Sequence, residues 1–186
     1  MYLSIIIPTV KAEKDLIEMI SQIKNTVTHE LDLIVISGDR SAAKNRNIGL
    51  DRARGEFVIM CDDDIEGFSQ GWDKDLIDAL ERSGASIVGA RLLNPDGTLQ
   101  LTNYANFDLS KDFVEVRTMI TACCAFKKST LRFDENYIGS GFEDTDFCKQ
   151  LGGKCFVVNS VTVTHRNENK NPFKKQNGNY FRNKWK

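Results

Sequence analysis

Several features that would assign this 186-residue chain to a common class are missing from its sequence. No apolar run approaches the roughly 20 residues that a membrane-spanning helix needs. The five cysteines show no CxxC spacing, which argues against a zinc site built from them. The net charge is only -1, so the chain as a whole is not suited to a polyanionic partner. Internal repeats and low-complexity linkers are also missing, and we therefore expect a single domain.

The chain also lacks the marks of a secretory leader at its start. It opens with Met-Tyr-Leu-Ser-Ile-Ile-Ile-Pro, with no basic residue before the apolar stretch and no cleavage site after it. This pattern predicts a first strand rather than a signal peptide. The adjacent Cys123 and Cys124 lie in an apolar run, as is typical of buried thiols in a reducing compartment. We therefore expect a cytoplasmic protein.

The pattern of apolar residues predicts an α/β fold. In the first 64 residues, short apolar runs at 3–7, 31–36 and 57–61 alternate with helical patterns at 14–23 and 41–53. This alternation predicts a single compact domain with a mainly parallel central sheet and helices on both faces. Later patterns predict helices at 72–82 and 144–151 and strands at 86–90, 118–126 and 155–164. We assign this domain to residues 1–165.

Residues 166–186 form a polar, basic tail with little periodicity. They include seven Lys or Arg and one acid, Glu168, so the rest of the chain carries a net charge of about -7. Two interpretations remain open. The tail folds over a bound diphosphate as a lid that uses Lys174, Lys175 and Arg182, or it is a solvated, partly disordered terminus.

Three consecutive aspartates, Asp62, Asp63 and Asp64, directly follow the third predicted strand. Ligands of open parallel sheets bind beyond the carboxyl ends of the strands. Carboxylates gathered at such a place need compensation, and a hard divalent cation such as Mg²⁺ or Mn²⁺ supplies it. The alternative is a solvated acidic loop that binds no metal.

Five segments together resemble the family 2 glycosyltransferases of the GT-A fold. The likeness runs from about Ser4 to His165, and its specificity lies in the order and spacing of the segments. They are SIIIPT at 4–9, SAAKNRNIGLDRARGEFVIMCDDD at 41–64, RLLNPDGTLQ at 91–100, FDENY at 133–137 and GFEDTDF at 141–147.

The resemblance implies a donor site that binds a nucleotide sugar, with UDP-glucose as the first expectation, and Mn²⁺ or Mg²⁺. It implies that Asp62 contacts the ribose or shares the metal, and that Asp63 serves the donor and metal motif. Metal ligands would also come from Asp64 and His165. Further nucleotide contacts would come from Pro8, Thr9, Asp39 (the base) and Arg46 (the base or the diphosphate). The family often shows Asp-Asp-Gly-Ser where this chain has Ser37-Gly38-Asp39-Arg40, so the residue that contacts the base is open.

On the acceptor side, the resemblance implies that Asp144 is the catalytic base and that Glu143 supports it or contacts the acceptor. One carboxylate on the acceptor side, apart from the metal carboxylates, fits direct displacement with inversion, because a glycosidase needs two carboxylates flanking one bond. The acceptor itself is open: a glycan, a lipid-linked sugar, a protein or a nucleic acid.

Each of these residues also has a structural interpretation. Arg46 could belong to a solvated helix face, Asp39 to a plain turn, and Glu143 and Asp144 to a helix N-terminus that favours acids. Three other functions compete. A nucleotidyltransferase would need a glycine-rich loop after the first strand, which residues 8–13 lack. The other two are a nucleotide-sugar-binding module without activity and a sugar transferase that uses the basic tail on nucleic acid.

Overall fold

The computed structural model describes residues 2–38, 41–100, 108–167 and 172–186 of the chain. Its elements, in order, are β1 (Tyr2–Thr9), η1 (Glu13–Leu16), α1 (Ile17–Thr26), β2 (Glu30–Ser37), α2 (Ala42–Arg52), β3 (Phe57–Cys61), β4 (Ile65–Glu66), α3 (Trp72–Ser83), β5 (Ile87–Leu93), β6 (Phe113–Val116), β7 (Cys123–Lys127), α4 (Glu143–Leu151), β8 (Cys155–His165) and α5 (Lys174–Lys184). Every predicted strand and helix occurs. The predicted strand at 118–126 begins only at Cys123, and β4, β6 and α5 were not predicted.

The strands form one mixed sheet in the order β2-β1-β3-β7-β5-β8-β4, with β6 also paired to β8. The first three strands are parallel, as predicted, and β5 is parallel to β8. However, β7 lies between β3 and β5 and runs antiparallel to both, and β4 and β6 run antiparallel to β8. The α/β class is thus confirmed, whereas the sheet is less parallel than expected. An apolar strand that is buried on both faces has the same sequence pattern in either direction.

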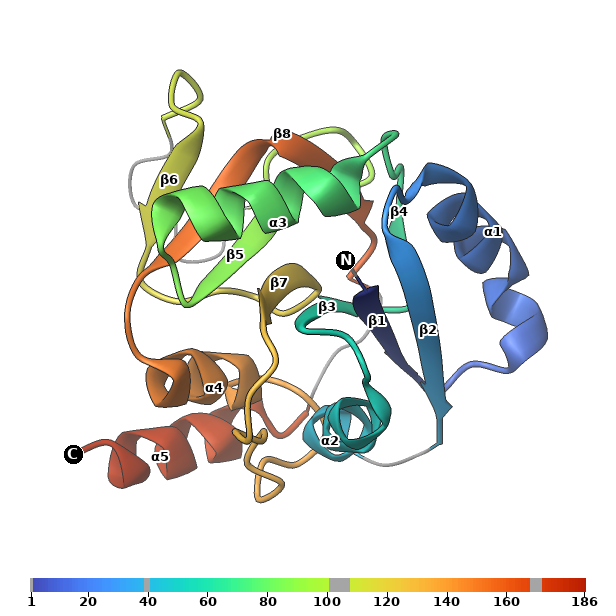
Figure 1. Cartoon of the computed structure of the whole chain (residues 1–186). Helices are drawn as coiled ribbons and strands as arrows, with labels where there is room; N and C mark the ends of the chain where they lie inside the picture. Colours follow the sequence, from blue (N-terminus) through green and yellow to red (C-terminus); the bar gives the residue numbers. More distant parts are fainter. Residues whose placement is uncertain (1, 39–40, 101–107, 168–171) are drawn as a thin grey trace.

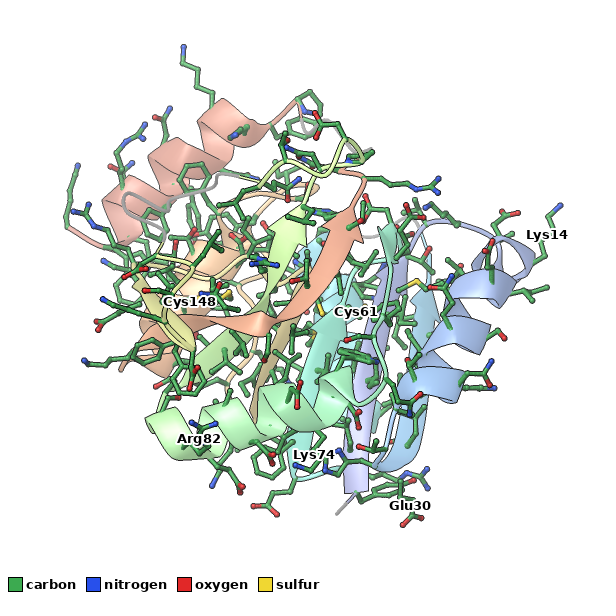
Figure 2. The ribbon with its side chains drawn as sticks, turned by 90° about the horizontal axis from the view of Figure 1, so that it is seen from above. Lys14, Glu30, Cys61, Lys74, Arg82 and Cys148 are labelled. Carbon is green, nitrogen blue, oxygen red and sulfur yellow. The ribbon has the colours of Figure 1, made fainter. Side chains whose placement is uncertain are left out.

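Successive strand residues face two separate cores, one on each side of the sheet. Within β1, Ile5 packs in the core that η1, α1 and α3 cover, and Ile6 packs in the core that α2 and α4 cover. Figure 1 shows these helices on the two faces. In Figure 2, Cys61 lies in the middle of the fold, while Lys14, Lys74 and Arg82 lie on its periphery. The sheet is therefore a rigid platform for the segments that leave its edge.

The C-terminal residues form a helix, α5, rather than the aperiodic tail that the sequence predicted. It lies alongside α4 (Figure 1), where Trp185 Nε1 donates a hydrogen bond of 2.6 Å to Asp146 of α4. The rings of Tyr180 and Phe181 pack on Tyr137 and Phe142. The sequence pattern is weak because α5 is polar on most of its surface and packs largely on an irregular segment. In the described ranges, no helix has the length and apolar character to cross a membrane.

Candidate active site

The predicted site residues converge on one cavity of about 430 Å³. It lies beyond the carboxyl ends of β1 and β3, where an α/β sheet places its ligand. The predicted residues that line it are Pro8, Thr9, Arg46, Asp62, Asp63, Asp64, Glu143, Asp144 and His165. Asp39, the remaining predicted residue, lies outside the described residues.

Hydrogen bonds join the ends of β1 and β3. The Thr9 hydroxyl, which is almost fully buried, donates to Asp63 Oδ2 and accepts from the Lys11 amide at 2.8 Å. Lys11 Nζ lies 3.6 Å from Asp63 Oδ1 and donates to the Asp63 carbonyl at 3.1 Å. Burial raises the pKa of Asp63, although Thr9 and Lys11 oppose that rise. Thr9, at the end of β1, and Lys11 therefore fix the position of the Asp63 carboxylate, and its role toward a donor stays a prediction.

Asp62, Asp64 and His165 form the group that could hold a metal ion. Each offers one ligand atom, and these atoms lie within 4.8 Å of one another. Strand pairing explains the juxtaposition, because Ile65 of β4 is the register partner of His165 in β8. The distance from His165 Nε2 to Asp64 Oδ1 is 3.3 Å. Burial lowers the pKa of His165, but the Asp64 carboxylate outweighs it, so the net shift is upward.

The surroundings of His165 fit a metal ligand. Its Nδ1 lies 2.7 Å from Oε1 of Gln100, an acceptor, so Nδ1 carries the proton and Nε2 faces Asp64. Gln100 is itself fixed, because its Nε2 donates to Asn94 at 3.3 Å. A ring nitrogen oriented by a second hydrogen bond is the usual arrangement of a metal-binding histidine. The residues present therefore fit a divalent cation, which Asp64 and His165 would help to hold.

Arg46 connects the two acidic segments of the cavity. One guanidinium nitrogen donates to Asp62 Oδ1 at 2.9 Å and another donates to Glu143 Oε1 at 2.8 Å. The guanidinium also lies over the Phe133 ring, 5.4 Å from its centroid. Arg46 is buried, and although burial opposes its charge, Asp62 and Glu143 keep its pKa above the ordinary value. The solvated helix face is therefore the wrong interpretation for this residue.

Asp144 is partly buried and has a pKa suited to proton transfer. Burial and the neighbouring Glu143 raise the pKa of Asp144 to about 7, while Arg46 opposes the rise. One carboxylate oxygen accepts a hydrogen bond of 2.7 Å from the Thr145 amide. Glu143 is 3% exposed, and its Oε2 has no hydrogen-bond partner in the described part of the chain. Two adjacent carboxylates thus differ: Glu143 is paired to Arg46, whereas Asp144 can take up a proton near neutral pH.

The C-terminal segment supplies one wall of the cavity through Pro172 and Phe173. The Phe173 side chain is 41% exposed there. The proposed lid residues Lys174, Lys175 and Arg182 are not among the described residues that line the cavity. The lid stays a prediction, and the described residues of the segment that line the cavity are Asn167, Pro172 and Phe173.

Three residues of the site illustrate what sequence reasoning missed. Gln100 fixes His165 from a turn. Asn45 lines the cavity and donates to the Gly38 carbonyl at 3.1 Å. Phe173 comes from a segment that showed no periodicity. Only Asn45 had a usable signal, because it adjoins Arg46 and lies three residues from Ala42, on the same helix face. His165, the residue that Gln100 orients, is 65 residues away in the sequence.

Comparisons with known proteins bear on both sequence and fold. A sequence model of the family described as "Glycosyl transferase family 2" matches residues 39–134, just over half of the chain. One curated relative, the uncharacterized protein y4gI of Sinorhizobium fredii (strain NBRC 101917 / NGR234), is 35% identical over 54 residues. That match covers 29% of this chain and 6% of the relative.

Three solved structures are similar over most of the chain. S. aureus TarS gives a TM-score of 0.62 at 15% identity, covering 89% of this chain and 36% of that one. GalNAc-T7, solved with UDP, GalNAc and Mn²⁺, gives a TM-score of 0.61 at 13% identity, and the match covers 88% of this chain and 43% of that one. A197 from STIV gives a TM-score of 0.60 at 14% identity, and the match covers 89% of this chain and 85% of that one. The chain thus spans less than half of the first two proteins, and at these identities the likeness shows a shared fold.

Proposed function

Because this chain belongs to glycosyl transferase family 2, we propose that it transfers a sugar from a nucleoside diphosphate to an acceptor hydroxyl, with inversion at the anomeric carbon. Its fold is the GT-A-like fold that the sequence predicted. The observation that carries the proposal is the cavity, where a metal-type cluster and a separate carboxylate of raised pKa face the same space.

We propose that Asp62, Asp64 and His165 hold a divalent cation. Mg²⁺ strongly prefers oxygen ligands, whereas this set includes an imidazole nitrogen, so we propose Mn²⁺ ahead of Mg²⁺. The GalNAc-T7 structure, which holds Mn²⁺ and UDP, supports this choice. When bound, the cation would stabilise the negative charge that develops on the diphosphate leaving group.

The residues of the chain would then divide the work. Pro8 and Thr9 would border the nucleotide. UDP is the first nucleotide to test, and UDP-glucose is the first sugar donor. Asp144 would take the proton of the acceptor hydroxyl. At the same time, the hydroxyl oxygen would attack the anomeric carbon, and the bond from that carbon to the diphosphate would break. Glu143 would keep Arg46 in place through their 2.8 Å hydrogen bond and would support the acceptor side of the cavity beside Asp144. The raised pKa of Asp144 favours catalysis, because a base with a pKa near 7 is matched to neutral pH.

Calorimetric titration tests this proposal. UDP and a panel of UDP-sugars would be titrated into wild-type protein with Mn²⁺ and with EDTA, and into Asp64→Ala. Asp75→Ala, an exposed aspartate of α3, is the matched control. We expect binding that requires Mn²⁺, is lost in Asp64→Ala and persists in Asp75→Ala.

A second assay, release of UDP from the sugar that binds most tightly, separates the enzyme from its main alternative. Turnover supports the transferase. Binding without turnover by any acceptor would favour a nucleotide-sugar-binding module. Absence of binding by folded wild-type protein would contradict both functions.

A further inference from the structure

The residue directly before Glu143 has an unusual backbone conformation. Phe142 has φ 74° and ψ -17°, in the left-handed region that bulky L-residues rarely adopt. It is the residue from which α4 begins, and its carbonyl accepts the hydrogen bond of the Asp146 amide at 2.9 Å. Such a conformation costs free energy and persists only where the surroundings enforce it. The contacts of Phe142 should therefore show what enforces it.

The enforcing contacts come from α5. A Cβ atom added to Gly178 would lie 3.1 Å from both Cε2 and Cζ of the Phe142 ring. The helix backbone therefore approaches the ring more closely than a residue with a side chain comfortably allows. The Phe181 ring, on the same helix, packs on Phe142 with 5.6 Å between the ring centroids. Glycine inside a helix is unfavourable, so its presence at 178 is explained by this close approach.

Two buried polar residues hold α5 in this place. The Asn177 side chain accepts from the Ile138 amide at 3.1 Å and donates to the carbonyls of Ile138 and Gly141 at 2.9 and 3.0 Å. At the other end of α5, the fully buried Asp146 accepts from Trp185 at 2.6 Å and Lys184 at 2.9 Å. The helix is thus bound to the chain on both sides of Glu143 and Asp144.

From these contacts we infer that α5 is a positioning element for the catalytic carboxylates, and that Gly178 is its key residue. By holding the Phe142 ring, α5 fixes the conformation from which α4 starts and hence the direction of Glu143 and Asp144 into the cavity. The inference rests on the proposed function for its catalytic meaning. Gly178 and Phe142 touch no reacting atom, so they act only through the residues they place.

The positioning role predicts a specific kinetic signature. Proton transfer and nucleophilic attack are sensitive to misplacement of the base by about 1 Å. The cluster of Asp62, Asp64 and His165, in contrast, extends from strands of the sheet, where β4 pairs with β8. Disturbing the contact between Gly178 and Phe142 should therefore lower kcat and leave the affinity for UDP and Mn²⁺ unchanged.

The test is a double-mutant cycle of Gly178→Ala and Phe142→Leu, with Gln176→Ala as the control on the exposed face of α5. Alanine is the better helix former, so loss of α5 is not the expected effect of Gly178→Ala. Release of UDP from the tightest-binding UDP-sugar gives kcat, and calorimetry with UDP and Mn²⁺ gives Kd. We expect Gly178→Ala to lower kcat about tenfold or more with Kd unchanged. In the Phe142→Leu background, where the ring is gone, the same substitution should have little effect.

Equal losses of kcat in both backgrounds would overturn the inference, as would wild-type kcat in Gly178→Ala. A second readout does not need activity: hydrogen exchange of the Asp146 amide, which donates to the Phe142 carbonyl. Exchange should be faster in Gly178→Ala than in wild type or Gln176→Ala, and unchanged exchange would overturn the inference. If wild-type protein turns over no UDP-sugar, the proposed function fails, and hydrogen exchange still decides whether α5 fixes the start of α4.

Discussion

The two acidic regions of the cavity are built in different ways. Asp62, Asp63 and Asp64 extend directly from β3, a strand buried in the middle of the sheet, and β1 and β8 flank them. Glu143 and Asp144 instead begin a helix whose first residue depends on α5, more than thirty residues later in the chain. The proposed donor region, Asp62 to Asp64 with His165, is thus held by strands of the sheet, whereas the proposed acceptor region, Glu143 and Asp144, depends on long-range contacts. Mutations should therefore affect metal and nucleotide binding separately from turnover.

Arg46 is the exception, because it contacts both regions, and its loss should have the largest effect. Arg46→Ala leaves the buried Glu143 carboxylate unpaired, so we expect the free energy of unfolding to fall by about 3–5 kcal/mol. Donor binding and turnover should both be lost. Arg46→Lys keeps the charge but not the two-sided geometry, and should recover stability in part.

Chemical denaturation measures this change, with Arg52→Ala, an exposed arginine of the same helix, as the control. A drop no larger than that of the control would mean that the two regions are not coupled through Arg46.

Gln100 should affect the donor region alone. Gln100→Ala removes the 2.7 Å partner of His165 Nδ1, and loss of such an outer contact weakens metal affinity about 10–100-fold. Calorimetric titration of Mn²⁺ in the presence of UDP measures the effect. The same affinity in Gln100→Ala and wild type would argue that His165 is not a metal ligand.

Asn177 should affect the acceptor region alone. Asn177→Ala removes the hydrogen bonds that the buried Asn177 amide donates to the carbonyls of Ile138 and Gly141, so the free energy of unfolding should fall by about 1–3 kcal/mol. The exposed Asn183→Ala on the same helix is the control. We expect lower kcat and unchanged Kd for UDP with Mn²⁺. Loss of donor affinity together with kcat would show that α5 supports the whole cavity.

The pH dependence of turnover should report the protonation of Asp144. Since the pKa of Asp144 is about 7, kcat should fall about tenfold per pH unit below 7 and level off above it. The free energy of unfolding should change with pH in the opposite direction to kcat. Between pH of about 4 and 7 the folded state binds more protons at Asp144 than the unfolded state does. The contribution of Asp144 to stability is therefore lost as pH rises through 7. A pH–rate profile and pH-dependent denaturation check both directions. A flat profile between pH 5 and 8 would exclude Asp144 as the base.

The same contrast explains what could be predicted from sequence. β1, β2 and β3 are apolar runs with clear ends, so their parallel arrangement and the position of Asp62–Asp64 followed from the pattern. The direction of β7 could not be predicted, because the apolar sequence of a strand buried on both faces does not indicate whether its neighbours run parallel or antiparallel to it. Glu143 and Asp144 were recognised by resemblance. Their support was not, because the contacts of Gly178 with Phe142 and of Asn177 with Ile138 join segments that have no common periodicity.

The most direct test of this division of the site is Asp144→Asn, compared with wild type for both Kd of UDP with Mn²⁺ and kcat of UDP release. The amide is nearly isosteric and cannot accept the acceptor's proton. The account predicts an unchanged Kd and a fall in kcat of about 10²–10⁴-fold. A kcat near that of wild type would show that Asp144 is not the base. Loss of donor affinity in step with kcat would show that the two regions are one site.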